Sequence, residues 1–279
     1  MTNHDDMSGM TTGPGSGFWL LTLLIIAGGC YLTGVQRLRS RGDRWPIRRS
    51  LTAAGGLLCL AAAVLPSPGP MPNFPAHVVQ HLMLAMLGPL LLALSAPVTL
   101  ALRTLPRTGR RVLLGAVHSP VAGFLTWAPV VLVLDVGGLY AYYLTPLYDA
   151  AHQQPWLQGL VHLHMFLAGC LLSWYLISPD PMTRRPGIRT ALVVLLIAGA
   201  AHDILAKFLN AHQLPASAGT AGQLQLGAQI MFYGGTIIET MLAVILMAAW
   251  YARGGRALQH QQRRTQHGAD ATVSPPTTR

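Results

Sequence analysis

Seven long apolar stretches run along the 279-residue chain, separated by short polar or Pro/Gly-rich segments. A helix that crosses a bilayer needs roughly 20 mostly apolar residues. The second stretch is the shortest, and the neutral Pro-rich segment after it can complete the crossing. The pattern predicts an all-α integral membrane protein, a bundle of seven transmembrane helices. The stretches cover residues 18–36, 50–66, 77–102, 119–144, 156–178, 188–209 and 226–251.

Composition supports a membrane protein and excludes other classes. Hydrophobic residues make up 52% of the chain, charged residues only 10%, and the mean hydropathy is +0.42. A soluble domain carries about 25% charged residues, and a disordered chain is far less apolar. The three cysteines lie far apart within apolar stretches, so we expect neither a disulfide framework nor a zinc finger.

The basic residues predict the orientation. The net charge is +10, and all arginines fall after the first, third, fifth and seventh stretches. Because cytoplasmic loops carry the excess of Lys and Arg, we expect the N-terminus outside and the C-terminus in the cytoplasm. No Lys or Arg precedes the first stretch, which is therefore expected to be a retained helix rather than a cleaved signal peptide. We expect an extracytoplasmic segment (1–17), a transmembrane domain (18–251) and a basic, disordered cytoplasmic tail (252–279).

Most of the eleven histidines fall in the predicted outer half of the bundle. His77 and His81 are four residues apart, which places both on one helix face. His162 and His202 lie at a similar depth, roughly 9 Å from the outer ends of their spans at 1.5 Å per residue. His164 is two residues from His162 and points to nearly the opposite face, so we favour His162 for a shared centre. A histidine in a span can also simply bond to a neighbouring helix.

Methionines at comparable levels indicate which metal such a centre would take. Imidazole together with thioether sulfur suits copper, and soft sulfur favours Cu(I). The N-terminal segment, with His4, Met7 and Met10, is a candidate for first capture of the ion. The methionines at the level of the histidines are Met83, Met86, Met165 and Met231.

Three acidic residues lie within the predicted spans, where charge is costly and usually functional. Asp135 and Glu239 have no local partner, and they are expected to accept hydrogen bonds from histidines, to bind metal or to carry protons. Asp203 adjoins His202 and is four residues before Lys207, so it either orients the histidine or pairs with the lysine.

A family resemblance follows from these residues. The segment HVVQHLML at 77–84, followed by GPLLL at 88–92, resembles the multi-span CtaG family of cytochrome c oxidase assembly factors, which are linked to caa-type haem–copper oxidases. The resemblance extends to HLH at 162–164, SPDP at 178–181 and AHD at 201–203.

The resemblance implies a non-enzymatic protein of the plasma membrane, the bacterial inner membrane, that helps to build the oxidase by handling copper. Its partners would be oxidase subunits or an intermediary copper protein, besides the lipid bilayer. The residues that carry the implied metal site are His77, His81, His162, His164, His202 and Asp203.

Two other functions remain open at this stage. A copper or proton transporter would use Asp135 and Glu239 as relay groups within the membrane. A haem-b redox protein would use His81 with His162 or His202 as axial ligands. The sequence contains no P-loop, dinucleotide fingerprint or nucleophile elbow, and arginines spread over four juxtamembrane segments do not form a nucleic-acid-binding face.

Overall fold

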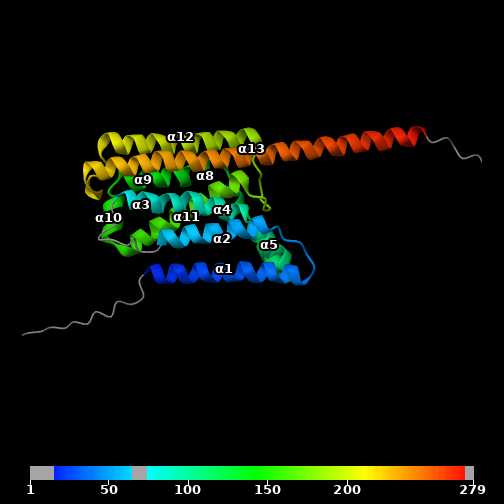
Figure 1. Ribbon diagram of the computed structural model, residues 1–279, viewed down its shortest axis with the longest axis horizontal. Helices are drawn as coiled ribbons and strands as arrows, with labels where there is room; N and C mark the ends of the chain where they lie inside the picture. Colours follow the sequence, from blue (N-terminus) through cyan, green and yellow to red (C-terminus); the bar gives the residue numbers. More distant parts are fainter. Residues whose placement is uncertain (1–15, 65–73, 274–279) are drawn as a thin grey trace, which may run out of the picture.

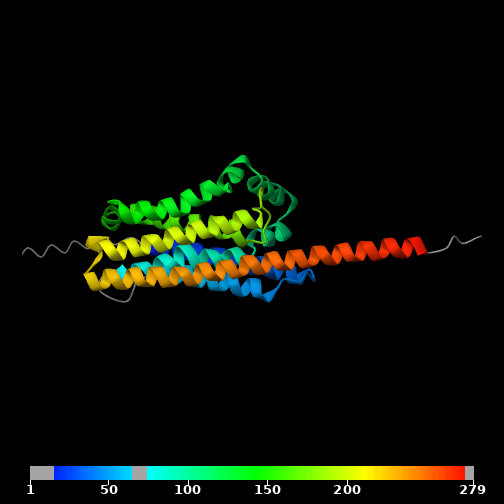
Figure 2. The same ribbon diagram turned by 90° about the horizontal axis from the view of Figure 1, so that it is seen from above.

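The computed structural model describes residues 16–64 and 74–273, and every regular element in them is helical. The long helices lie side by side in one elongated bundle (Figures 1 and 2). Five of them are continuous: α1 (Ser16–Ser40), α2 (Ile47–Val64), α11 (Pro155–Ile177), α12 (Ile188–His212) and α13 (Ala221–Val273).

Two further passes through the bundle are interrupted by wide π-helical turns. The first consists of α3 (Phe74–His81), η1 (Leu82–Leu87) and α4 (Gly88–Leu94). The second consists of α8 (Ala128–Leu132), η2 (Val133–Gly137) and α9 (Gly138–Leu144). Short elements join the passes at the ends of the bundle: α5 (Pro97–Thr104), α6 (Arg107–Val117), α7 (Pro120–Leu125), α10 (Leu147–Gln153) and the 3-10 turn η3 (Ala216–Ala218).

Among the described residues, six helices are long and apolar enough to cross a membrane, or up to seven with the bent pair Ala128–Leu144 and Leu147–Gln153, which turns by 77°. The sequence therefore predicts the apolar helices correctly. The seventh crossing depends on the pass through α8 and α9. The described chain enters at one end of the bundle and leaves at the other (Figure 1).

Proline explains where two spans differ from the prediction. The span predicted for 77–102 ends at Leu94, because Ala96 is left-handed (φ 54°) and Pro97 starts the separate helix α5. The span predicted for 119–144 is broken after α7, because Pro129 cannot continue a helix and its ring clashes with the carbonyl of residue 125.

The tail also differs from the prediction. Residues 252–273 continue α13 as helix instead of forming a disordered segment, since Ala, Leu, Gln and Arg are good helix formers and no proline occurs in this part of the sequence. Residues 1–15, which include the proposed capture segment at His4, lie outside the described residues. So do the Pro-rich segment 65–73 and residues 274–279.

Side-chain burial is that of a helical bundle in an apolar solvent. The core contains fully buried Phe74, Leu205 and Met231, whereas Ile25 and Leu196 are more than 70% exposed. The arginine-rich segments meet at the end where α5 lies, here called the α5 end, and the opposite end carries α10 (Figure 1). His77 and His81 belong to the half nearer the α10 end.

Candidate metal-binding cavity

One cavity in the bundle interior collects imidazole, thioether and carboxylate groups. It lies between α3, η1, η2, α9, α11, α12 and α13 and has a volume of about 50 Å³, which is room for a few water molecules. Seven helical segments therefore contribute side chains to one small space. Its polar and sulfur-bearing lining consists of His81, Met86, Asp135, His164, Met165, Ser173, His202 and Glu239.

The first π-turn shapes this cavity from the side of α3. Pro89 has no N–H, and its ring clashes with a carbonyl four residues earlier in a regular helix. The chain widens to i−5 bonding instead, and Gly88 N–H donates to the Met83 carbonyl. The Ala85 carbonyl then faces α11 so closely that a Cβ placed on Gly169 would lie 1.8 Å from its oxygen. A glycine is therefore needed at 169.

The second π-turn binds His164. His164 Nε2 donates to the Leu134 carbonyl at 3.1 Å, and a Cβ on Gly138 would lie 2.3 Å from that nitrogen. Because a carbonyl only accepts, Nε2 carries the proton and Nδ1 keeps the lone pair. Asp135, in the same turn, lines the cavity.

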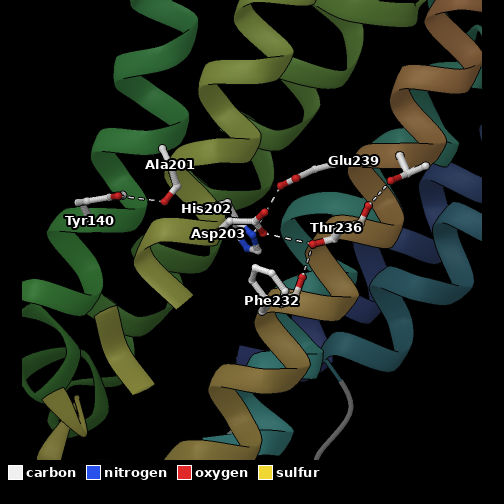
Figure 3. A network of polar contacts seen from close by, with 8 residues as sticks. Tyr140, Ala201, His202, Asp203, Phe232, Thr236 and Glu239 are labelled. Carbon is white, nitrogen blue, oxygen red and sulfur yellow. Dashed lines mark hydrogen bonds and ion pairs between the residues drawn. The ribbon is translucent and has the colours of Figure 1, made fainter. Parts of the chain in front are cut away.

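His81 and His202 face each other across the cavity. Their exposed fractions are 6% and 5%, their ring centres are 6.3 Å apart, and the ring planes differ by 12°. His81 Nδ1 and both nitrogens of His202 are buried without a hydrogen-bond partner. His202 Nδ1 lies 3.6 Å from Glu239 Oε1 (Figure 3). Since buried polar atoms are normally hydrogen-bonded, this pair has unused capacity for a ligand.

The other face of α12 carries Asp203, which does not line the cavity. Thr236 Oγ1 lies 3.3 Å from Asp203 Oδ1, within reach to donate (Figure 3). The Lys207 ammonium lies 4.7 Å from the centre of the Phe232 ring, so the alternative pairing of Asp203 with Lys207 is replaced by a cation–π contact.

The structure reverses the preference between the two histidines of α11, His162 and His164. His164 lines the cavity, whereas His162, which the sequence favours, lines a separate apolar pocket with Leu24, Leu60 and Phe166. Two residues correspond to about 200° on a helix, so only one of the two imidazoles can face the centre.

His77 lies one turn from His81 toward the α10 end and is 4% exposed. Its ring centre is 5.7 Å from that of Tyr142, 5.6 Å from that of Tyr148 and 5.6 Å from that of His152. The sequence suggests none of these neighbours, since His152 falls between the stretches predicted for 119–144 and 156–178. The chain instead turns sharply after α9, and α10 brings His152 and Tyr148 over the end of α3.

The donor groups restrict which ligand fits. In the described part of the chain, no three His, Cys, Asp or Glu side chains are arranged to hold a metal ion. Two imidazoles with nearby thioethers suit Cu(I). A cavity of about 50 Å³ is far below the 300–1,000 Å³ of sites for larger ligands, so the haem alternative does not fit here.

Comparison with known proteins gives a family and a set of relatives. The family described as cytochrome c oxidase caa3 assembly factor (Caa3_CtaG) matches residues 29–253. An uncharacterized protein of Mycobacterium leprae is 29% identical over 273 residues, which cover 90% of this chain and 40% of the relative. Uncharacterized proteins of Mycobacterium bovis and Mycobacterium tuberculosis are each 30% identical over 272 residues. In both cases the match covers 88% of this chain and 41% of the relative.

The chain therefore spans about 40% of the length of the curated relatives it matches. No solved structure matches it significantly.

Proposed function

Because the chain belongs to the family of caa3 cytochrome c oxidase assembly factors, we propose that it binds a copper ion in the cavity and delivers it to an oxidase subunit or to an intermediary copper protein. The delivery takes place at the extracytoplasmic face of the plasma membrane. The copper ion is cargo that passes through the protein, and the role is that of a non-enzymatic assembly factor.

The pair formed by His81 and His202 supports this proposal most directly. With metal–nitrogen bonds of about 2.0 Å, two imidazoles that share an ion have ring centres about 6 Å apart. The observed separation is 6.3 Å, and three of the four ring nitrogens are buried without partners. Each ring has at least one nitrogen without a hydrogen-bond partner that can serve as a ligand.

The surroundings of the pair suit an ion that must leave again. Met86 and Met165 bring soft sulfur to the same cavity. Glu239, 3.6 Å from His202 Nδ1, would orient the ring from outside the coordination sphere. Few strong ligands leave coordination positions open, so a ligand from the receiving protein can displace the imidazoles one at a time.

The distribution of charge supports the extracytoplasmic location. The arginine-rich segments gather at the α5 end, and the positive-inside rule assigns that end to the cytoplasm. The histidines of α3 belong to the other half of the bundle and therefore to the outer leaflet.

Metal analysis tests the proposal. The full chain, purified in lipid nanodiscs, is loaded with Cu(I) under reducing conditions, freed of excess copper and analysed for copper per protein. We expect bound copper in the unchanged protein and at least a tenfold loss in the His81→Asn/His202→Asn variant. His118→Asn, at an exposed histidine near the α5 end, is the matched control. Unchanged copper content in the double variant would refute the copper site.

Transport is a second candidate, favoured by one observation. Asp135 and Glu239 line the same cavity, and carboxyl groups inside a membrane commonly mark ion or proton pathways. Copper flux into proteoliposomes that Asp135→Asn abolishes would favour a transporter. Binding without flux would favour delivery on one side of the membrane.

A further inference from the structure

A second pair of histidines lies at the α10 end, between the cavity and the surface. His152 on α10 is exposed, whereas His77 on α3 is 4% exposed. Their ring centres are 5.6 Å apart, with the planes tilted by 58°. This distance resembles that between His81 and His202, although the two pairs come from different helices.

Hydrogen bonding fixes which nitrogen of His152 is free. Nδ1 lies 2.8 Å from the Tyr148 carbonyl, and because the carbonyl only accepts, Nδ1 carries the proton. The lone pair is then at Nε2, the usual position for a metal ligand. The ring is held against Tyr148, with centres 4.2 Å apart, so the imidazole is positioned before any ion arrives.

The buried side of this cluster lacks polar partners. His77 Nε2 and the hydroxyls of Tyr142 and Tyr143 are all buried without a hydrogen-bond partner. Leaving such atoms unsatisfied costs about 1–3 kcal/mol each. Three of them around one pair of histidines indicate that something other than the described chain completes the cluster.

We propose that His152 and His77 form a capture site that takes Cu(I) from the extracytoplasmic side and passes it to His81 and His202. This inference rests on the proposed function, in which the cavity is the deeper copper site. The steps are of similar length: 5.6 Å from His152 to His77, about one helical turn from His77 to His81, and 6.3 Å from His81 to His202. Exposure falls from the exposed His152 to three buried rings.

Transfer along this path is ligand exchange at the ion. One copper–nitrogen bond forms as another breaks, and neither electrons nor protons change hands. Neutral ligands do not compensate the charge of a buried ion. The free-energy cost of burying such an ion rises with its charge, so neutral ligands suit a monovalent ion better than a divalent one. The nearby carboxylate, Asp149, accepts a hydrogen bond from Ser217.

Loading kinetics test this inference. The full chain in nanodiscs is mixed with Cu(I) bound to a coloured chelator, and the loss of colour reports the transfer. His152→Gln should slow loading at least tenfold while leaving the copper held at the deeper pair unchanged at equilibrium. Thermal unfolding of each variant confirms that the fold is retained.

His212→Gln is the matched control. His212 also lies near the α10 end, its Nδ1 donates to the Phe208 carbonyl at 3.0 Å, and its ring packs on Phe208 with centres 4.0 Å apart. It therefore repeats the local arrangement of His152, and no ring contact joins it to another histidine among the described residues. This variant should load at the unchanged rate.

The possible outcomes separate this inference from the proposed function. Loading of His152→Gln at the original rate, or loss of its equilibrium copper, would overturn the capture site. If His81→Asn/His202→Asn loses copper while His152→Gln loads at the original rate, the copper site in the cavity is retained. Only the transfer path from His152 is then rejected.

Discussion

Replacing Gly169 by alanine tests the close approach of α11 and η1 directly. The added Cβ would lie 1.8 Å from the Ala85 carbonyl oxygen, 2.8 Å from its carbon and 3.2 Å from Pro89 Cγ. Real Cβ contacts are essentially never below 3.0 Å, so the two segments must separate by about 1.2 Å, the difference between 3.0 and 1.8.

The obstacle is backbone, and this sets the magnitude. A flexible side chain could rotate away, but the Ala85 carbonyl is held by the wide turn and by the proline that follows it. Overpacking a well-packed interior costs typically 1–3 kcal/mol and occasionally more, and we expect about 3 kcal/mol here. For a chain of this size that corresponds to a fall in melting temperature of roughly 6–12 °C.

Thermal unfolding in nanodiscs measures this effect, with Gly159→Ala as the control. Gly159 is on the same helix, and a Cβ there meets nothing within 4 Å. Its replacement should change stability by no more than about 0.5 kcal/mol. Because Ala85 is one turn from His81, Gly169→Ala should also lower the copper content. Equal melting temperatures for the two variants would show that the close approach does not exist.

Two further substitutions probe the cavity and the α5 end. In Gly235→Ala the new Cβ would lie 2.2 Å from His202 Cε1 and displace the ring. Copper per protein should therefore fall at least fivefold, although no ligand is changed, and Gly254→Ala is the control. Unchanged copper in Gly235→Ala would contradict the proposed position of the ring. In Asp180→Ala the first turn of α5 loses the carboxylate that accepts from its backbone N–H groups at 3.1 and 2.7 Å. Loss of such a cap costs about 1–2 kcal/mol, so hydrogen exchange in α5 should accelerate about tenfold, and an unchanged rate would refute the capping role.

The apolar helices can be predicted from the sequence because a membrane leaves the backbone few choices. With no water to bond exposed N–H and C=O groups, a long apolar stretch must form a helix, and its length alone locates it. The histidine pattern also predicts that His81 and His202 meet, since both lie at similar depths on apolar helices.

The remaining features depend on tertiary packing, which local sequence does not determine. The separation of His162 and His164 shows that they point apart, but the rotation of α11 about its axis depends on tertiary contacts such as the close approach of Gly169 to Ala85. The end of the apolar stretch at residue 144 predicts an interruption but not the direction of α10, which decides whether His152 meets His77. Asp180 looks like an ordinary loop residue until α5 is placed beside it.

The wide turn before Pro89 also affects how related sequences should be aligned. A π-helical turn contains one residue more than the α-helical turn it replaces, and one residue corresponds to about 100° of rotation. A relative with a single-residue deletion between 82 and 87 would keep both histidines of α3 and yet direct them toward different neighbours. The spacing from His81 to Pro89 therefore carries information about the arrangement of the cavity that residue identities alone do not.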